Sequence, residues 1–390
     1  MNMTNEERNV LDQIERFWNE KPSMNDNLSA LFYNIMDDLA AYPDAWLFVV
    51  FGGRGTGKTY GALKGGYFEN IRFVYAKRTK KDVNLICTSM KKNNKFKDID
   101  ADVDFSPFKS VNRDCNINVR GIPIDDGIGA FFNCGEDGNP YGRPVGYILA
   151  AAGVKDIKGF DLSDCDWFIF DEFVPKIYER ISRGEGEEIM DMYETISRDR
   201  ELRGRPPLKM LCFANADNAS CSLTNVLEIT DDIAELATQD AGYKYIEERG
   251  IFIRKLKNKA FSEAKKKTKI YQAMYNTQWG KMAFENEFSF NDFSNVKKNN
   301  LKNCSPYCYF KHKNRTYYIY LKNDTGEFFI TESRFTQKTQ RYDLAKENDQ
   351  KRFYYEQVID LRSACMDNRV SFSSFSIYDL IINYPKFYKI

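Results

Sequence analysis

Short apolar runs alternate with helix-compatible stretches along the first part of the chain. The runs have the length and composition of strands that are buried on both faces. They lie at 46–51, 73–76, 167–170 and 208–213. Helices are expected at 4–18, at 28–39, just after 59 and around 189–196. Strands that alternate with helices predict an α/β fold with a mainly parallel sheet covered on both faces.

Two other stretches have the pattern of β-structure. Residues 105–150 alternate short apolar runs with Gly and Asp-Gly turns, which predicts hairpins inserted between the core strands. Beyond about residue 290, aromatic-rich strands flank a turn at 323–326, and helix-like sequence follows near 341–366. These strands are expected at 307–310, 316–321 and 327–330. The pattern predicts a second, smaller α+β domain.

Composition narrows the possible functions. The chain has 390 residues, more than one core usually organises, and its net charge of +1 excludes a uniformly basic nucleic-acid binder. Nine scattered cysteines indicate reduced thiols, and we expect a cytosolic protein with no signal peptide and no membrane partner. The single histidine, His312, removes most general-base and triad chemistries and argues against a zinc site at Cys304 and Cys308.

A glycine-rich loop follows the first apolar run and matches the pattern G-x-x-x-x-G-K-[ST]. It consists of Gly52, Gly53, Arg54, Gly55, Thr56, Gly57, Lys58 and Thr59. Glycines let the backbone curl so that successive N–H groups point at phosphate oxygens, and the following helix directs its positive end to the same place. Lys58 suits the β- and γ-phosphates, and the Thr59 hydroxyl suits Mg²⁺. We predict a site for ATP and Mg²⁺; the alternative is a glycine-rich surface turn.

Polar residues at the ends of two later strands complete this prediction. Asp171 ends the run 167–170, where a carboxylate can hold Mg²⁺, and the adjacent Glu172 can activate the attacking water. The spacing leaves room for one more strand between Lys58 and Asp171, as in the additional-strand, catalytic-glutamate division of P-loop ATPases. Asn215 follows the run 208–213, where such enzymes sense the γ-phosphate. The alternatives are an acidic surface pair for Asp171 and Glu172 and a strand-end cap for Asn215.

Arginines follow the helix predicted around 189–196. In ring ATPases this region reaches the neighbouring subunit, so Arg198 can neutralise charge on the γ-phosphate of that subunit. Intrahelical pairing of Arg198 or Arg200 with Glu194 or Glu201 is the alternative.

Two basic stretches have the charge to contact DNA phosphates, and such contacts do not read the base sequence. The candidates are Lys77, Arg78, Lys80, Lys81, Lys255, Lys257, Lys265 and Lys266. Solvated helix faces are the alternative for both stretches, because the near-neutral total charge means that acids offset these bases elsewhere.

Together these motifs resemble the genome-packaging ATPases of small tailed phages with protein-capped DNA, which are relatives of the large terminase subunit. The phosphate loop with Arg54, the segment Phe168–Phe173, the stretch Ser197–Glu201 and Ala214–Ala216 carry the resemblance. It matches Arg198 to a trans-acting arginine finger and Lys158 to a second basic residue that crosses the subunit interface. The likeness covers roughly residues 45–225 and is weak beyond them.

The resemblance implies a homo-oligomeric ring, most commonly a pentamer, that drives double-stranded DNA into a viral procapsid. Its partners would be the phage portal (connector) and, in some systems, a packaging RNA. The protein would then act in the host cytoplasm and transiently at the portal vertex. The expected organisation is a P-loop ATPase domain at 1–250, a basic helical linker or lid at 251–288 and an RNase H-like, DNA-binding domain at 289–390.

The sequence of the C-terminal domain argues against nuclease activity. An RNase H-like nuclease needs a metal-binding aspartate on its first strand, and the best candidate strand, 316–321, has none. Asp324, Asp360 and Asp379 do not replace it, so a nuclease-inactive domain is expected. Two alternatives stay open: a nuclease-competent terminase large subunit, and a nucleotide-switched DNA-binding or scaffold ATPase.

Overall fold

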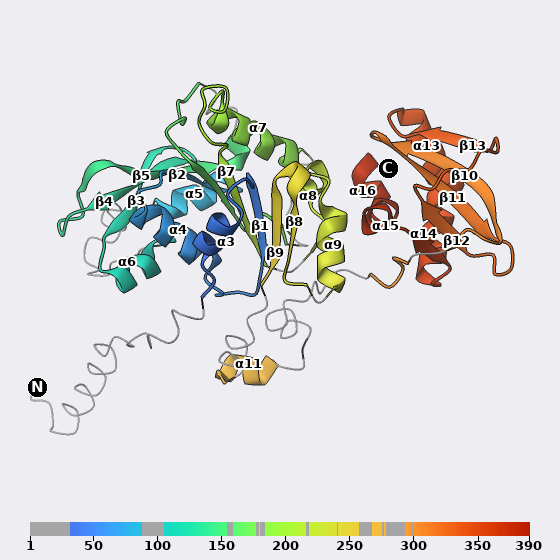
Figure 1. The fold of residues 1–390 in the computed structure, drawn as a ribbon, viewed down its shortest axis with the longest axis horizontal. Helices are drawn as coiled ribbons and strands as arrows, with labels where there is room; N and C mark the ends of the chain where they lie inside the picture. Colours follow the sequence, from blue (N-terminus) through green and yellow to red (C-terminus); the bar gives the residue numbers. More distant parts are fainter. Residues whose placement is uncertain are drawn as a thin grey trace, which may run out of the picture.

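The computed structural model shows a chain with two β-sheets, each with its own helices (Figure 1). It describes residues 32–87, 105–153, 159–176, 179, 184–215, 218–239, 241–256, 267–274, 277, 293–297 and 300–390. The helix expected at 4–18 lies outside the described residues. No helix in the described ranges is long and apolar enough to cross a membrane.

The larger sheet has nine strands in the order β3-β4-β5-β2-β6-β7-β1-β9-β8. The six strands from β5 to β9 are mutually parallel, and antiparallel strands lie at both edges. The strands are β1 (Leu47–Phe51), β2 (Phe73–Lys77), β3 (Val119–Asp125), β4 (Ile128–Cys134), β5 (Pro140–Ala150), β6 (Trp167–Asp171), β7 (Lys209–Ala214), β8 (Tyr243–Ile246) and β9 (Ile251–Lys255). The predicted mainly parallel sheet is confirmed, and the predicted hairpins of 105–150 extend it beyond β2.

Helices cover both faces of this sheet because successive strand residues point to opposite sides. On one face, Phe48 and Val50 of β1 pack with α3 (Ile35–Ala41), α4 (Lys58–Phe68), α5 (Lys80–Ile86) and α6 (Lys109–Cys115). On the other face, Leu47 and Val49 pack with α7 (Glu185–Ser197), α8 (Ser222–Val226) and α9 (Thr230–Thr238). The described chain also contains the 3₁₀ turn η4 (Glu247–Arg249) and α11 (Lys269–Met274).

Local sequence sets where several of these elements begin. Asn34 caps α3 by accepting a hydrogen bond from the backbone N–H of Met36. Thr79 and Asp82 form a capping box that starts α5 directly after β2. These caps lie close to the carboxyl ends of the parallel strands, so they fix the turns from which the site residues project.

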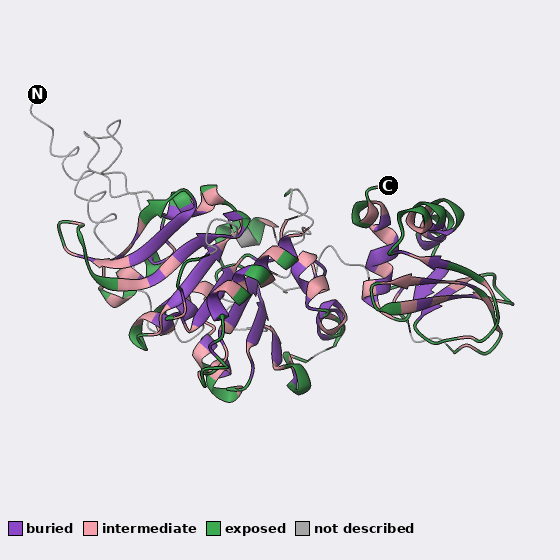
Figure 2. Cartoon of the chain, turned by 90° about the horizontal axis from the view of Figure 1, so that it is seen from above, coloured by how far each residue is buried: buried purple, intermediate pink, exposed green. Residues whose placement is uncertain are grey.

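The smaller sheet has five strands in the order β13-β10-β11-β12-β14, with its helices on one face (Figure 2). The strands are β10 (Cys304–His312), β11 (Arg315–Lys322), β12 (Phe328–Thr331), β13 (Gln340–Asp343) and β14 (Val370–Phe372). The helices are α13 (Glu347–Phe353), the π-helix η5 (Tyr354–Val358), α14 (Ile359–Met366), α15 (Phe375–Ile382) and α16 (Tyr384–Tyr388). The predicted smaller α+β unit is therefore present.

Three elements differ from the sequence prediction. Within the described residues, the helix expected at 28–39 begins only at Ile35, because Asn34 is extended and caps α3. Residues 251–255 were expected to open a helical linker, but they form β9, which pairs with β1 inside the larger sheet. Residues 341–343 were expected to be helical, but they belong to β13, which pairs with β10. In the last two cases pairing with a distant strand overrides the local charge pattern.

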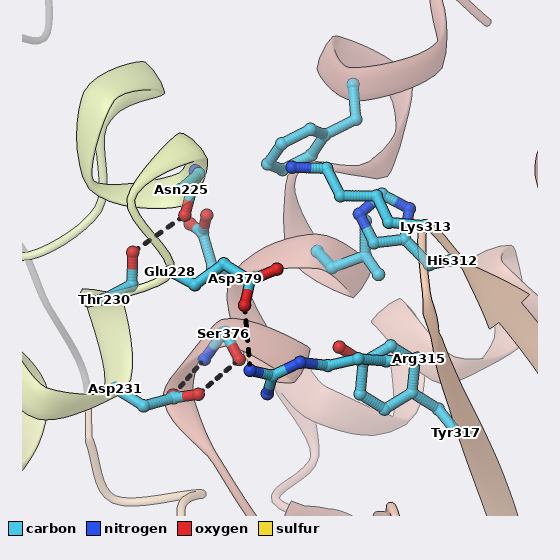
Figure 3. Close-up of a pocket in the computed structure, with 12 residues that line it drawn as sticks. Asn225, Glu228, Thr230, Asp231, His312, Lys313, Arg315, Tyr317, Ser376 and Asp379 are labelled. Atoms are coloured by element: carbon cyan, nitrogen blue, oxygen red, sulfur yellow. Dashed lines mark hydrogen bonds and ion pairs between the residues drawn. The ribbon is translucent and has the colours of Figure 1, made fainter. Parts of the chain in front are cut away.

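The two sheets are joined where α15 packs beside α9 (Figure 3). The Asp231 carboxylate accepts hydrogen bonds from the backbone N–H of Ser376, at 2.8 Å, and from its hydroxyl, at 2.6 Å. The Ser220 hydroxyl donates to the buried Asp379 carboxylate at 2.7 Å. Phe375 extends the apolar core beneath the larger sheet. Asp379 is thus part of the contact between the two units.

Candidate active site

The phosphate loop adopts the curled backbone that its glycines predict. Gly55 and Gly57 have φ values of 74° and 90°, in the region that favours glycine, and α4 begins at Lys58. A Cβ on Gly57 would also lie 2.7 Å from the Phe32 Cβ. The Lys58 ammonium is buried and donates to the carbonyls of Gly52 and Gly53 at 2.8 and 3.0 Å. The loop therefore holds its lysine against its own backbone, in reach of the cavity.

Asp171 meets the phosphate loop because β6 and β1 are parallel strands of one sheet, separated by β7. Thr59 donates its hydroxyl hydrogen to Asp171 Oδ1 at 3.0 Å, and Tyr75 donates to Oδ2 at 2.8 Å. Burial raises the pKa of Tyr75 well above its ordinary value, and Asp171 adds to the shift, so the phenol remains a donor. A hydroxyl beside a carboxylate offers two oxygen ligands of the kind that Mg²⁺ prefers.

Glu172 projects from the end of β6 into solvent. Its side chain is 66% exposed, and its backbone has φ of 57°, an uncommon value for a residue with a Cβ. The Lys77 ammonium lies 3.3 Å from Glu172 Oε2 and 3.4 Å from Asp171 Oδ2. Burial opposes the charge of Lys77, but the two carboxylates raise its pKa above the ordinary value. Lys77 therefore offsets part of the negative charge of the acidic pair in this structure.

One cavity of about 500 Å³ brings together most of the predicted nucleotide residues. Its lining includes Arg54 to Thr59, Asp171, Glu172 and Asn215. Phe32, Tyr60 and residues of α6 line it as well. Sequence reasoning missed this second group, because none of its members belongs to a recognised motif and α6 reaches the loop only by packing against α4.

A smaller cavity lies at the junction of the two sheets, between Asp231 and Arg315 (Figure 3).

Arg198 lies at the end of α7 and does not line the cavity. Its backbone has φ of 47°, and its guanidinium contacts the Phe160 carbonyl and lies 3.9 Å from Asp161. The side chain is 38% exposed. Arg200, by contrast, is buried and pairs with Asp166 and the Cys165 carbonyl. Lys158 lies outside the described residues.

The candidate DNA contacts are dispersed in the structure. Lys77 and Arg78 pair with carboxylates beside the nucleotide cavity, and Lys80 lies 3.5 Å from Asp126. Lys81 is exposed on α5, while Lys255 ends β9 and donates to the Ala237 carbonyl at 3.1 Å. Lys257, Lys265 and Lys266 lie outside the described residues. Contact with DNA stays a prediction for all of these residues, although Lys77 and Arg78 already pair with carboxylates of the chain.

The phosphate loop, the acidic end of β6 and the polar end of β7 at one edge of a parallel sheet define the fold of a P-loop nucleoside triphosphatase. Among solved structures, the bacteriophage Phi-29 viral genome packaging motor assembly matches with a TM-score of 0.61 and 15% identity. That match covers 92% of this chain and 99% of the other. The Phi-28 gp11 DNA packaging motor matches with a TM-score of 0.54 and 18% identity, over 92% and 98% of the two chains.

These likenesses show a shared fold across both sheets, including the smaller one, where the sequence resemblance was weak. No family model and no characterised protein sequence matched the chain. The resemblance stated from the motifs is therefore supported by the fold of nearly the whole chain.

Proposed function

We propose that the chain is the ATPase of a viral genome-packaging motor, which hydrolyses ATP to move double-stranded DNA into a procapsid. One observation carries this proposal: nearly the whole chain, with both sheets, shares its fold with two packaging motors. The cavity that gathers Lys58, Asp171, Glu172 and Asn215 supplies the chemistry. The P-loop fold by itself occurs in many enzymes with different functions. The second sheet, which follows the larger one in the chain and is covered by the same structural matches, narrows the choice to packaging motors.

The site residues have distinct roles in this proposal. Lys58 and the loop N–H groups bind the β- and γ-phosphates, and Arg54 and Asn215 flank the γ-phosphate. Thr59 and Asp171 would hold Mg²⁺, which screens the phosphate charge. Glu172 accepts a proton from the water that attacks the γ-phosphorus, and ADP and inorganic phosphate are released.

Arg198 acts on the site of the neighbouring subunit, and the resemblance assigns Lys158 as a second basic residue contributed across the same interface. Arg198 is partly exposed and lies outside its own cavity, which supports this role. The proposal therefore includes a homo-oligomeric ring, in which each site is complete only at a subunit interface. The portal, and a packaging RNA where one exists, are the further partners that this assignment implies.

The smaller unit is proposed to be a nuclease-inactive, RNase H-like domain. Strands β10, β11 and β12 form an antiparallel meander, and β13 adds in parallel to β10, as the first four strands of that fold do. The fifth strand differs, because β14 pairs with β12. The first strand is β10, not 316–321 as expected, and β10 also lacks a carboxylate. Asp379 is used at the domain contact.

The test is the ATPase rate of the full chain with and without duplex DNA, compared with Glu172→Gln. The motor predicts DNA-stimulated hydrolysis in the wild type and turnover slower by about 100-fold in Glu172→Gln, with ATP still bound. Equal turnover in the two proteins would overturn the site assignment. Hydrolysis indifferent to DNA would favour a nucleotide-switched scaffold, and cleavage of plasmid DNA with Mg²⁺ or Mn²⁺ would favour a nuclease-competent terminase.

A further inference from the structure

Arg78 connects segments that leave two strands of the site. It directly follows β2, and its side chain is 16% exposed. The Nη2 nitrogen of its guanidinium donates to the Phe173 carbonyl at 2.9 Å and to the Glu172 carbonyl at 3.2 Å. The other donors reach Glu185, the first residue of α7, and Glu179, at 3.2 Å. Arg78 therefore binds both the backbone of Glu172 and the start of α7.

The geometry requires a guanidinium. Glu172 turns away from β6 with a positive φ, so its carbonyl and the next one leave the ladder of the sheet. One nitrogen of Arg78, Nη2, binds both carbonyls while a different nitrogen, Nε, binds a carboxylate on another element, and the planar guanidinium of arginine provides these separate nitrogens where a single ammonium does not. Glu185 is 5% exposed, and burial raises its pKa while Arg78 opposes the shift. Without Arg78, a buried carboxylate would face two unpaired carbonyls.

The first turn of α7 also contacts the segment that leaves β7. The Gly186 N–H donates to the Ser222 hydroxyl at 2.9 Å, and a Cβ on Gly186 would lie 2.6 Å from the Ser222 carbonyl oxygen. Ser222 begins α8, seven residues after Asn215 in the nucleotide cavity. The start of α7 thus touches the segments that follow β2 and β7, and Arg78 links it to the segment that follows β6.

Helix α7 is a rigid element between this junction and Arg198. It spans 13 residues, about 20 Å, and Ile189, Met192 and Ile196 are buried against the sheet. Arg198 is its C-cap, so a shift or tilt of the first turn moves the guanidinium at the far end. An interior packed this closely transmits a displacement and does not absorb it.

We infer that Arg78 is a positioning residue that fixes the backbone of Glu172 to α7, and thereby sets where Arg198 is presented to the neighbouring subunit. The inference rests on the proposed function, because it takes Glu172 as the base and Arg198 as the group acting in trans. Arg78 touches neither phosphate nor water in this role; it acts through the carbonyls of residues 172 and 173 and through Glu185.

The first experiment separates positioning from folding within one subunit. In Arg78→Lys the ion pair with Glu185 can persist, but a single ammonium nitrogen cannot at the same time take the place of Nη2 at the two carbonyls. We expect kcat to fall about tenfold or more while the Kd for ATP and the thermal unfolding midpoint change little. Glu179→Gln, which removes the exposed partner of Arg78, is the matched control and should keep its kcat. Full kcat in Arg78→Lys would show that a positive charge suffices and would overturn the inference.

The second experiment tests the link to Arg198 in mixed rings. Arg198→Ala subunits keep their own site but provide no arginine, and Lys58→Ala subunits provide the arginine but cannot hydrolyse. A mixture should recover ATPase activity that neither protein has alone. Adding Arg78→Lys to the Lys58→Ala subunit should reduce that recovery about tenfold. Unreduced recovery would overturn the inference, whereas a mixture that never recovers activity would overturn the trans role of Arg198 in the proposed function.

Discussion

Thr59 and Asp171 are joined by a hydrogen bond of 3.0 Å, although 112 residues separate them in the sequence. The bond exists because β1 and β6 are parallel, so their carboxyl ends meet at one edge of the sheet. This edge is where ligands bind in open α/β sheets. The phosphate loop and the acidic strand end, recognised separately as motifs, are therefore parts of one site.

Removal of Lys77 should strengthen Mg²⁺ binding but slow the turnover of ATP. Its ammonium lies between Asp171 and Glu172, so Lys77→Met leaves two carboxylates without their counter-charge. We expect the Mg²⁺ concentration for half-maximal ATPase to fall about threefold or more, because the site becomes more negative. We expect kcat to fall as well, because Glu172 loses a partner that orients it. Mg²⁺ titration of the ATPase rate measures both, with Lys81→Met on exposed α5 as control; unchanged values in Lys77→Met would contradict the prediction.

The only histidine provides a direct test of the packing in the smaller unit. Burial, with a smaller contribution from Lys313, lowers the pKa of His312 to about 4. The folded protein therefore holds it neutral, and its contribution to stability is present above the ordinary pKa of about 6.5 and is lost as the pH falls towards 4. The loss amounts to at most about 3 kcal/mol.

An NMR pH titration measures this pKa without assignment work, because the chain has one imidazole. His312→Gln should also remove part of the loss of unfolding free energy between pH 6.5 and 4. A measured pKa near 6.5 in the folded protein would show that the imidazole is solvated, contrary to the structure.

The larger unit supplies the helix cap for α15. Ser374 makes no capping side-chain bond, and Asp231 on α9 accepts from the Ser376 N–H instead. Asp231→Ala should lower the stability of α15 and of the contact between the units by about 0.5–2 kcal/mol. Faster hydrogen exchange in α15 is the readout. Asp232→Ala, which removes a surface pair with Lys244, is the control and should leave α15 exchange unchanged; equal effects of the two variants would contradict the capping role.

Gly186 should not tolerate a methyl group. In an ordinary helix Gly→Ala stabilises by up to about 1 kcal/mol, but here the Cβ would lie 2.6 Å from a backbone oxygen of Ser222. The contact outweighs the propensity, so we expect Gly186→Ala to lower the unfolding free energy by about 1–3 kcal/mol. Gly242→Ala, where a Cβ meets open space, is the control for chemical or thermal unfolding. A stabilised Gly186→Ala would show that α7 and α8 are not in close contact.

Much of the fold could be predicted from local pattern. The runs that became β1, β2, β6 and β7 are apolar at nearly every position because both of their faces are buried. The prediction failed at β9, Ile251–Lys255, because the lysine-rich stretch that follows these residues favours a solvated helical linker over the whole range. Its position beside β1 is determined by pairing with a strand some 200 residues away, and sequence windows do not contain that information.

The candidate site, like the fold, could be predicted only in part from local sequence. Lys58, Thr59, Asp171, Glu172 and Asn215 could be predicted because each follows a recognisable strand, and parallel strands bring their carboxyl ends together. The partners of Lys77 and Arg78 could not be predicted. As a run of basic residues they suggested a DNA surface, but the turn of Glu172 away from β6 places carboxylates and carbonyls within their reach.

The sequence by itself determined the phosphate loop, the acidic strand end and the alternation of strands and helices, because these depend on residue type and short-range periodicity. Only the tertiary structure decided what each basic side chain contacts, where Arg198 is held and how α15 joins the two units. Those relations depend on strand order and on backbone turns, which bring together residues that the sequence keeps far apart.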